Sequence, residues 1–379
     1  MTRRAPRILL LFSDDSTLIF ATRMRSLLRD ADAPAEIVMG AYLPETALSD
    51  RQLRQFIPDG RYEILDKPAL AEALMGGRYA AIVTSRVYGH LDFLLSKALN
   101  RQKAGRARVI AFLGGLDFFP HRGMRNRRNC DAVYLFPRST CDRFRNTEVR
   151  PATPELAAWP HVGFGHPAFL YPRKTPAASL PETGDIYFFT QALSPSTARA
   201  RLHMLRVMAA IARRNPDRTV WIKLRHLPDE NTRHLHRERH DYPSLAEQVP
   251  DLPANLKLTA CTMDQAMRNA ALGITCTSTA AIDLLREGVP TIIHLDYLDR
   301  ALDPLVAPMQ RLFEHSNLIR PLEDLLHLRF APPDPGWLSR MFCPPDLGAD
   351  VLRVLDTLNA PARRQTAPRR KKTPAAMQL

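Results

Sequence analysis

The sequence predicts an α/β fold of two doubly wound, Rossmann-like domains that face each other across a cleft. The chain has 379 residues, of which 45% are hydrophobic, and one core seldom serves more than about 250–300 residues. In both halves, short β-rich runs alternate with segments of helical period, which is typical of parallel strands joined by crossover helices. Residues 151–181 are rich in proline and aperiodic, as an interdomain connection is.

The expected strands form two series. Those of the first half are Arg7–Phe12, Ala35–Tyr42, Tyr62–Leu65, Tyr79–Thr84, Val109–Leu113 and Asp131–Phe136. Those of the second half are Asp185–Thr190, Thr219–Leu224, Asn255–Ala260, Leu272–Cys276 and Thr291–Leu295, with a long amphipathic helix at Ser196–Arg214. We expect a first domain at 1–170, a linker at 171–184, a second domain at 185–345, a C-terminal helix at 346–360 that folds back across the connection, and a disordered basic tail at 361–379.

The formal net charge of +14 gathers at two places. The tail carries basic residues among proline and alanine, and such a composition cannot bury enough apolar surface to fold. It suits peripheral contact with an anionic membrane through Arg363, Arg364, Arg369, Arg370, Lys371 and Lys372. A second cluster of arginines lies within residues 122–145. Because no nucleic-acid recognition module accompanies the charge, a nucleic-acid partner is disfavoured.

Membrane and metal signals are missing from the sequence. No apolar run approaches the ~20 residues that span a bilayer, and no signal-peptide pattern follows Met1, so we expect a cytoplasmic protein. The five cysteines are scattered and lack CxxC spacing, which argues against a disulfide framework or a zinc site. We expect no metal and no cofactor.

Residues 273–290 carry the clearest sign of chemistry. A buried strand is expected to end there, and Thr277, Ser278 and Thr279 stand where the next helix begins. Backbone N–H groups at such a place favour a phosphate. One hydroxyl could serve only to cap the helix, but a cap needs one of the three. We therefore expect these residues to bind phosphate.

A second strand end, within Trp221–Glu230, brings Lys223, Arg225 and His226 to the same carboxyl edge. Two cations and an imidazole form a strong anion site, and His226 could protonate a leaving phosphate near neutral pH. The alternative is a surface strand end whose cations pair with the acidic residues that follow. Three histidines within 234–240 are flanked by arginines, which indicates a solvated basic face rather than a metal site.

The second half resembles the donor domain of GT-B glycosyltransferases, in particular bacterial sialyltransferases and Kdo transferases that use CMP-activated sugars. In that group, a His-Pro pair after one strand and a Ser-Ser or Ser-Thr pair at a helix start hold the nucleotide phosphate. The run Arg225-His226-Leu227-Pro228 is similar to the first element, although Leu227 separates His from Pro, and Thr277-Ser278-Thr279 is similar to the second. The Gly-x-Pro at 288–290 resembles a helix end found widely in GT-B folds. The likeness covers residues 185–300, and the whole chain resembles an uncharacterised bacterial family of predicted transferases.

Two further residues gain an expected role from this resemblance. Glu287 would contact the donor ribose, as an acidic residue near this helix does in many GT-B enzymes, or else lie in solvent. Gln191, at the end of the first strand of the second domain, would reach the donor.

An inverting transfer needs a general base, which the first domain should supply. Asp117 and His121 follow an expected strand and two glycines that permit a tight turn. The stretch is similar, in changed order, to an acidic element of the sialyltransferase group. We expect Asp117 to be the base, with His121 next. Arg122 and the arginines that follow suit an anionic acceptor such as a sialylated, Kdo-containing or phosphorylated glycan.

The rival stretch follows the first strand directly, at Ser13–Thr17. Asp14 and Asp15 could orient an acceptor there, whereas Ser16 is expected to cap the next helix. His166, in the connection, could face the cleft, although a Pro-rich turn also explains the glycines beside it.

The resemblance implies an inverting, metal-independent glycosyltransferase that builds a bacterial surface polysaccharide from a nucleotide sugar, with sialic acid or Kdo from a CMP donor as the expected sugar. Two alternatives share the fold: a CDP-glycerol-type polyol-phosphate transferase and a UDP-sugar 2-epimerase. The epimerase needs further acidic and histidine residues around the sugar, and we find no matching set. Outside enzymes, the basic tail allows a non-catalytic scaffold that binds nucleic acid or membrane.

Overall fold

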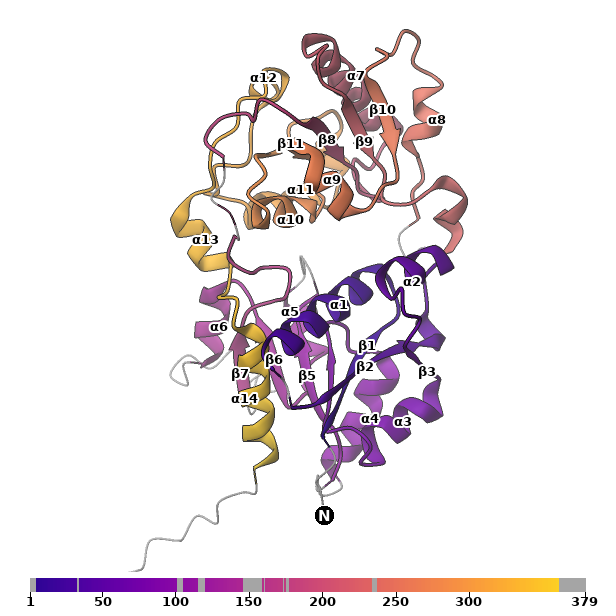
Figure 1. Cartoon of the computed structure of the whole chain (residues 1–379), viewed down its shortest axis with the longest axis vertical. Coiled ribbons are helices and arrows are strands. Elements are labelled where there is room, and N and C mark those ends of the chain that lie inside the picture. The colour runs from indigo at the N-terminus through magenta and orange to yellow at the C-terminus, as the bar shows by residue number, and fades with distance from the viewer. Residues whose placement is uncertain are drawn as a thin grey trace, which may run out of the picture.

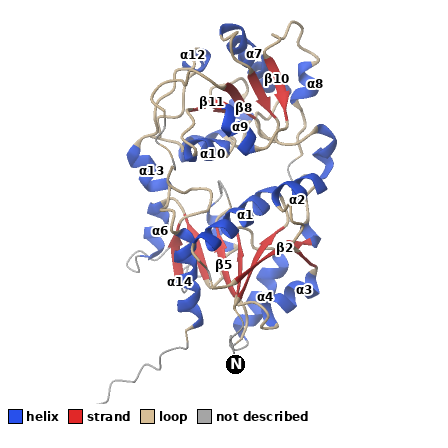
Figure 2. Ribbon diagram, in the orientation of Figure 1, coloured by secondary structure: helices blue, strands red, loops and turns tan. Residues whose placement is uncertain are grey.

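The two halves of the chain form two separate parallel sheets (Figures 1 and 2). The structure, a computed structural model, describes residues 5–32, 34–100, 105–114, 120–145, 159, 161–172, 174, 177–233 and 237–360, without the side chains of residues 98–100, 120–122 and 232–233. In Figure 1 the second domain lies above the first, and α13 (Pro335–Met341) and α14 (Leu347–Asn359) run down one side toward the first domain. The predicted α/β class with two doubly wound domains is confirmed.

The first sheet has seven strands in the order β3-β2-β1-β4-β5-β6-β7. The chain enters at a central strand, winds outward to one edge and then fills the other side, which is the doubly wound arrangement. After its first residue β1 is buried throughout, as parallel strands covered on both faces are. The strands are β1 (Arg7–Phe12), β2 (Glu36–Tyr42), β3 (Glu63–Leu65), β4 (Ala81–Thr84), β5 (Arg108–Phe112), β6 (Ala132–Leu135) and β7 (His161–Phe164).

The second sheet repeats the same order with five strands, β10-β9-β8-β11-β12. Its central strand β8 pairs with β9 on one side and β11 on the other. The strands are β8 (Asp185–Phe189), β9 (Val220–Lys223), β10 (Leu256–Thr259), β11 (Ala270–Thr275) and β12 (Thr291–Ile293).

Helices connect the strands in both domains. In the first domain they are α1 (Asp15–Asp30), α2 (Asp50–Phe56), α3 (Lys67–Met75), α4 (Gly89–Asn100), α5 (Pro120–Arg125) and α6 (Arg138–Arg145), with the 3₁₀ turn η1 (Leu43–Glu45). In the second domain they are α7 (Ala198–Arg214), α8 (Tyr242–Ala246), α9 (Met263–Asn269), α10 (Ala280–Arg286), α11 (Val306–Leu312) and α12 (Leu322–Leu326), with the 3₁₀ turns η3 (Pro228–Arg233) and η4 (Arg300–Leu302).

Every predicted strand is present with ends within about two residues of those expected. One strand was missed, because β7 lies inside the stretch interpreted as an aperiodic connection. It extends the sheet by pairing with β6. A Cβ on Gly163 would lie 2.4 Å from the ring of Tyr134, so the glycine that disguised this strand is required by packing rather than by a turn.

The last helix belongs to the first domain. α14 packs against α1 and β5, and the hydroxyl of Tyr134 donates a hydrogen bond of 2.7 Å to Asp350. The chain crosses between the domains twice, and the two crossings are bonded to each other. The amide of Tyr171 donates to the carbonyl of Cys343 at 3.0 Å, and the amide of Cys343 donates to the carbonyl of Phe169 at 2.7 Å.

We expect Gly348→Ala to lower the free energy of unfolding. A Cβ at this position of α14 would lie 2.2 Å from the carbonyl oxygen of Leu27 in α1, so the two helices must separate, at a cost of about 1–3 kcal/mol. The control is Gly89→Ala, because a Cβ on that exposed glycine of α4 meets nothing within 4 Å. Urea unfolding of both variants checks the prediction, and equal midpoints would contradict the packing of α14 on α1.

Among the residues that the structure describes, no helix is long and apolar enough to cross a bilayer. The basic tail at 361–379 lies outside the described residues.

Candidate active site between the two domains

The residues singled out in the second domain follow three neighbouring strands. Gln191 follows β8, Lys223 ends β9 with Arg225 and His226 just beyond, and Thr277 to Thr279 follow β11. Because β8 lies between the other two and strands are spaced about 4.8 Å apart, the ends of β9 and β11 are ~10 Å apart. The carboxyl edge of a parallel sheet is also where such folds bind ligands.

The cations after β9 are arranged less simply than expected. Nζ of Lys223 donates to the carbonyl of Leu224 at 2.9 Å, and burial lowers its pKa to about 8. The guanidinium of Arg225 reaches across to the first domain, where its Nε and Nη2 lie 3.0 and 2.5 Å from Oδ2 of Asp15. The alternative, in which the cations pair with the acidic residues that follow them, is wrong for Arg225, since its partner comes from the other domain.

His226 is held by a residue that sequence reasoning missed. Its Nε2 lies 3.2 Å from Oδ1 of Asn231. The backbone of Glu238 fixes that amide, because its N–H donates to Oδ1 and its carbonyl accepts from Nδ2, both at 2.7 Å. Oδ1 can only accept, so Nε2 of His226 carries the proton. This nitrogen would have to leave Asn231 before it could bond to a donor phosphate.

The three hydroxyl residues after β11 have three different environments. The hydroxyl of Ser278 accepts from the amide of Ala280 at 3.2 Å and so caps the helix. Thr279 is exposed and makes no capping bond. Oγ1 of Thr277 is buried without a hydrogen-bond partner among the described residues. The capping alternative therefore accounts for Ser278 alone. Since α10 is only seven residues long, its dipole contributes less than the hydroxyl and amide groups of this loop.

The remaining two donor candidates, Gln191 and Glu287, lie in different surroundings, and their donor role stays a prediction. The side-chain oxygen of Gln191 accepts from the amide of Leu193 and so bonds within its own loop. Glu287 is half-buried at the far end of α10, beside Arg286, whose charge acts on His166 near the crossings. The acidic residue of α10 that faces the first domain is Asp283, which forms an ion pair with Arg23 of α1.

A buried ion pair supports the loop after β8. Nη1 of Arg201 bonds to Glu238, its Nε donates to the carbonyl of Pro195 at 2.8 Å, and its Nη2 donates to the carbonyls of Gln191 and Ala192 at 3.0 and 2.7 Å. Arg201 and Glu238 are 1% and 7% exposed. Because Glu238 also fixes the amide that holds His226, one pair links the loops after β8 and β9.

In the first domain, the two adjacent carboxylates after β1 play different parts. Asp14 is buried and caps α1: its carboxylate accepts from the amide of Thr17 at 2.9 Å and pairs with Arg86 at 2.9 Å. The expectation that Ser16 caps this helix was wrong, because Asp14 does so and Ser16 donates to it. An acceptor would have to displace several bonds to reach Asp14. Asp15 is partly exposed and is the carboxylate directed at the second domain.

Three other residues of the first domain have limited description. Asp117 lies outside the described residues. His121 and Arg122 lie in α5, but their side chains are not among those described.

His166 is buried among aromatic rings, which include Phe20 and Phe136. Burial lowers the pKa of His166 to about 3, so it is neutral at physiological pH and does not serve as a cation.

Within the described residues, three arginine–carboxylate pairs join the domains across their facing surfaces. Besides Arg225 with Asp15 and Arg23 with Asp283, Arg51 of α2 binds Glu230 of η3 with both guanidinium nitrogens at 2.6 Å. Ser49 also donates to Glu230 at 3.2 Å. Figure 1 shows α1 and α2 on the side of the first domain that faces the second. These pairs connect the two sides of the candidate site.

The Arg51–Glu230 pair predicts a pH-dependent stability. The hydrogen bond from Arg51 is the main cause that lowers the pKa of Glu230 to about 2, against roughly 4.3 for an unfolded glutamate. A depressed carboxyl pKa stabilises the folded state fully above the unfolded pKa, and that contribution disappears as pH falls toward the folded pKa. We expect Arg51→Gln to lose about 1–2 kcal/mol at pH 7, a figure reduced for the partial exposure of Arg51.

The difference from the unmodified protein should shrink below about pH 4.5. Denaturant unfolding between pH 3 and 7 measures it. Arg54→Gln is the control, since Arg54 lies exposed on the same helix and forms no ion pair within the described part of the chain. A pH-independent difference would show that Arg51 does not act through Glu230.

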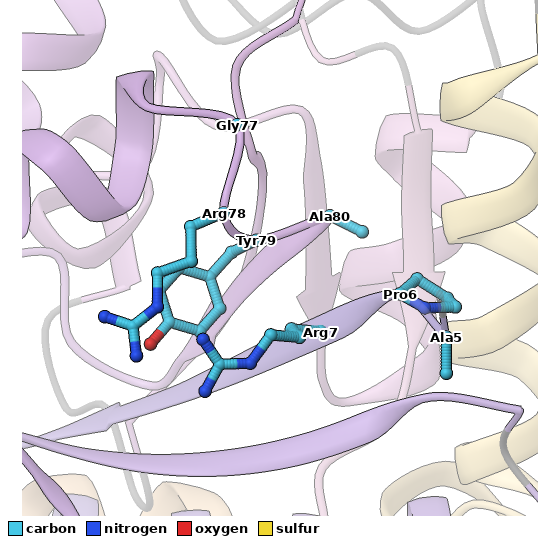
Figure 3. A pocket seen from close by; sticks show the side chains of 7 residues that line it. All are labelled: Ala5, Pro6, Arg7, Gly77, Arg78, Tyr79 and Ala80. Carbon is cyan, nitrogen blue, oxygen red and sulfur yellow. The ribbon is translucent and has the colours of Figure 1, made fainter. Parts of the chain in front are cut away.

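A cavity of 620 Å³ lies at the opposite end of the first sheet, where β1 and β4 begin (Figure 3). Figure 3 shows the guanidinium groups of Arg7 and Arg78 close to the ring of Tyr79, with distances of 5.0 and 5.3 Å to its centre. Both arginines already pair with Glu63. The cavity is on the amino edge and its cations are neutralised, so it is not the candidate site.

Metal binding finds no support in the described ranges, where no group of three or more His, Cys, Asp or Glu side chains is placed to hold an ion. Two of the three histidines within 234–240 fall outside those ranges.

Comparison with solved structures shows which folds are similar. UDP-GlcNAc 2-epimerase from Methanocaldococcus jannaschii has a TM-score of 0.55 and 10% identity, over 93% of this chain and 99% of that one. UDP-GlcNAc 2-epimerase from Neisseria meningitidis, bound to UDP-GlcNAc, has a TM-score of 0.53 and 10% identity, over 93% and 99%. UGT2 from Phytolacca americana, complexed with UDP-2fluoro-glucose and pterostilbene, has a TM-score of 0.50 and 11% identity, over 97% of both chains.

At such identities the likeness shows the fold, which is GT-B-like. Among curated proteins, none matches the sequence. A protein-family model matches residues 8–358, which is nearly the whole chain and includes every residue placed at the interdomain site. The chain belongs to the family described as "Putative glycosyltransferase (DUF6716)".

Proposed function

We propose that this enzyme is an inverting glycosyltransferase that takes a sugar from a nucleotide donor bound to the second domain. One observation carries the proposal: Arg225, at the end of β9, meets Asp15, which follows β1 of the other domain. A cation suited to the donor phosphate thus lies next to a carboxylate suited to take a proton, one from each domain. Membership of a glycosyltransferase family supports the reaction type.

The chemistry assigns a role to each side. Asp15 takes the proton of the acceptor hydroxyl, whose oxygen forms a bond to the anomeric carbon of the donor sugar. The bond from that carbon to the phosphate oxygen breaks, and its electron pair leaves with the nucleotide. Arg225 and Lys223 offset the charge that grows on the leaving phosphate, and the loop at Thr277–Thr279 offers hydroxyl and amide donors. These cations let the reaction proceed without a bound metal.

Among the described side chains, we choose Asp15 as the general base. Asp117 and His121, which the sequence favoured, lie outside those side chains and stay predictions. Asp14 does not compete with it, because its carboxylate is buried in the cap of α1 and paired with Arg86. Asp15 has one oxygen on Arg225 and the other on the amide of Ser16 at 2.9 Å. It is therefore held in a fixed direction toward the donor side.

The finer assignment concerns donor and acceptor. The sequence resemblance favours a CMP-activated sialic acid or Kdo, whereas the similar structures are named for UDP sugars. For the acceptor we propose an anionic bacterial surface glycan, bound near the arginines of residues 122–145, while the basic tail holds the enzyme at the inner membrane surface.

Ligand-dependent melting of the purified protein tests the proposal. We would measure the shift with CMP, CDP, UMP, UDP, GDP and ADP, because a ligand at about 100 times its dissociation constant adds roughly 2.7 kcal/mol to stability. A nucleotide that stabilises the unmodified protein but not Arg225→Gln supports the donor site and identifies the nucleobase of the donor. Arg206→Gln, on the exposed face of α7, is the control. A folded protein that responds to none of the six would refute the proposal.

A further inference from the structure

The donor-side cation Arg225 is occupied by the protein itself. Both its Nε and Nη2 are directed to the same oxygen of Asp15, at 3.0 and 2.5 Å, and the two side chains are 25% and 16% exposed. A phosphate therefore cannot take the Nε–Nη2 edge of this guanidinium without displacing the carboxylate. The site holds an internal anion in the position that the donor requires.

Asp15 has stabilising contacts besides Arg225. Its other oxygen accepts from the amide of Ser16 at 2.9 Å, and it stands in the first turn of the sixteen-residue helix α1, where the helix dipole favours a negative charge. If Arg225 is taken by another anion, Asp15 keeps the bond from the amide of Ser16 and a favourable field. A carboxylate released in this way is able to accept a proton.

A donor phosphate is expected to interact more strongly with Arg225 than the carboxylate of Asp15 does. It carries more negative charge than a carboxylate and offers more acceptor oxygens to the planar guanidinium. Lys223 is a second cation near this position, since the charges of Arg225 and Arg51 both lower its pKa. Burial lowers the pKa of Lys223 to about 8. A phosphate beside its ammonium group would stabilise the charged form.

We propose that Asp15 is an internal competitor for the donor phosphate: it neutralises Arg225 in the empty enzyme and is exchanged for the phosphate when the nucleotide sugar binds. The exchange couples the two halves of the reaction, since the general base becomes available only when the donor is in place. It predicts ordered binding, donor before acceptor. This inference rests on the proposed function, because it takes Arg225 as a donor ligand and Asp15 as the base.

The other two pairs between the domains give the exchange a fixed framework. Arg51 with Glu230 and Arg23 with Asp283 do not involve Arg225, so they can persist while Asp15 and the phosphate change places. The site then responds to the donor by one local exchange and not by separation of the domains.

Binding constants of the full-length protein test the exchange. Titration calorimetry with CMP, UDP and inorganic pyrophosphate would compare the unmodified protein with Asp15→Asn, Arg225→Gln and Arg23→Gln. We expect Asp15→Asn to bind the preferred probe about three- to tenfold more tightly, because one ion pair no longer has to be broken. Arg225→Gln should bind it at least as much more weakly, and Arg23→Gln, which breaks the pair with Asp283, should match the unmodified protein. Asp15→Ser repeats the test if the asparagine variant does not fold.

Each other outcome rejects a distinct statement. Equal or weaker binding by Asp15→Asn, with normal binding by the unmodified protein, would overturn the competition and leave the proposed function standing. Tighter binding by both Asp15→Asn and Arg23→Gln would mean that loosening the domains, and not freeing Arg225, controls access. Unchanged binding by Arg225→Gln would place the anion elsewhere. Failure of every probe to bind the unmodified protein would remove the proposed function itself.

Discussion

Asp15→Asn is expected to lower kcat about 10²–10⁴-fold, which is the usual contribution of a general base. The amide has nearly the same shape and can still accept from the amide of Ser16, but it cannot take a proton. Because Asp15 lies on the first domain and the donor on the second, donor affinity should not fall with kcat. The melting experiment identifies the nucleobase of the donor. Steady-state kinetics with a sugar nucleotide that carries this nucleobase would then separate the change in kcat from the change in donor affinity.

The matched control for this variant is Asp50→Asn. Asp50 stands in the first turn of α2 as Asp15 does in α1, and it is exposed and forms no ion pair within the described side chains. Its kcat should stay within a factor of about two, as expected of a surface change of under 0.5 kcal/mol. If Asp15→Asn also stays within that range, Asp15 is not the base, and Asp117 becomes the residue to change next.

Arg201→Ala is expected to have the largest effect on stability, a loss of about 3–5 kcal/mol in the free energy of unfolding. The variant leaves Glu238 buried without its cation and removes the hydrogen bonds that Arg201 donates to three loop carbonyls. Burial already raises the pKa of Glu238, so the carboxyl should take up a proton when Arg201 is removed. Arg201→Lys should restore little, because an ammonium cannot reproduce the fork that binds Glu238 and three carbonyls at once.

Denaturant unfolding, with Arg206→Ala as control, tests this expectation. Arg206 is exposed on the same helix, and its replacement should change stability by less than about 0.5 kcal/mol. A fall of less than 1 kcal/mol in Arg201→Ala would mean that the pair does not organise the loops after β8 and β9.

The fold could be predicted because its signals are local. A run such as Arg7–Phe12 is buried on both faces, and any strand so placed is apolar throughout. β7 escaped because Gly163 and the prolines around it carry the usual marks of a turn, whereas the glycine in fact makes room for Tyr134. Such a packing requirement depends on a neighbouring strand and leaves no periodic trace.

The site could be predicted only in part, for a similar reason. Strand ends and hydroxyl residues pointed to Arg225 and to residues 277–279 as candidates, since each signal lies within a few positions, and their donor role stays a prediction. The contact between Arg225 and Asp15 joins residues 210 positions apart. The spacing of residues within one domain does not reveal how that domain faces the other. Arg201 did leave a signal: it lies one turn before Leu205 on the apolar face of α7, and an arginine there indicates a buried partner.

The return of α14 to the first domain matters for how the protein is made. A ribosome extends a chain by about 5–20 residues per second, so roughly 10–40 s separate the completion of β7 from that of α14. During this interval the surface of α1 that α14 covers stays open to other chains and to chaperones. Nascent first domains are thus completed only when α14 has been translated. A chain that stops early, after an intact second domain, would carry its defect in the first.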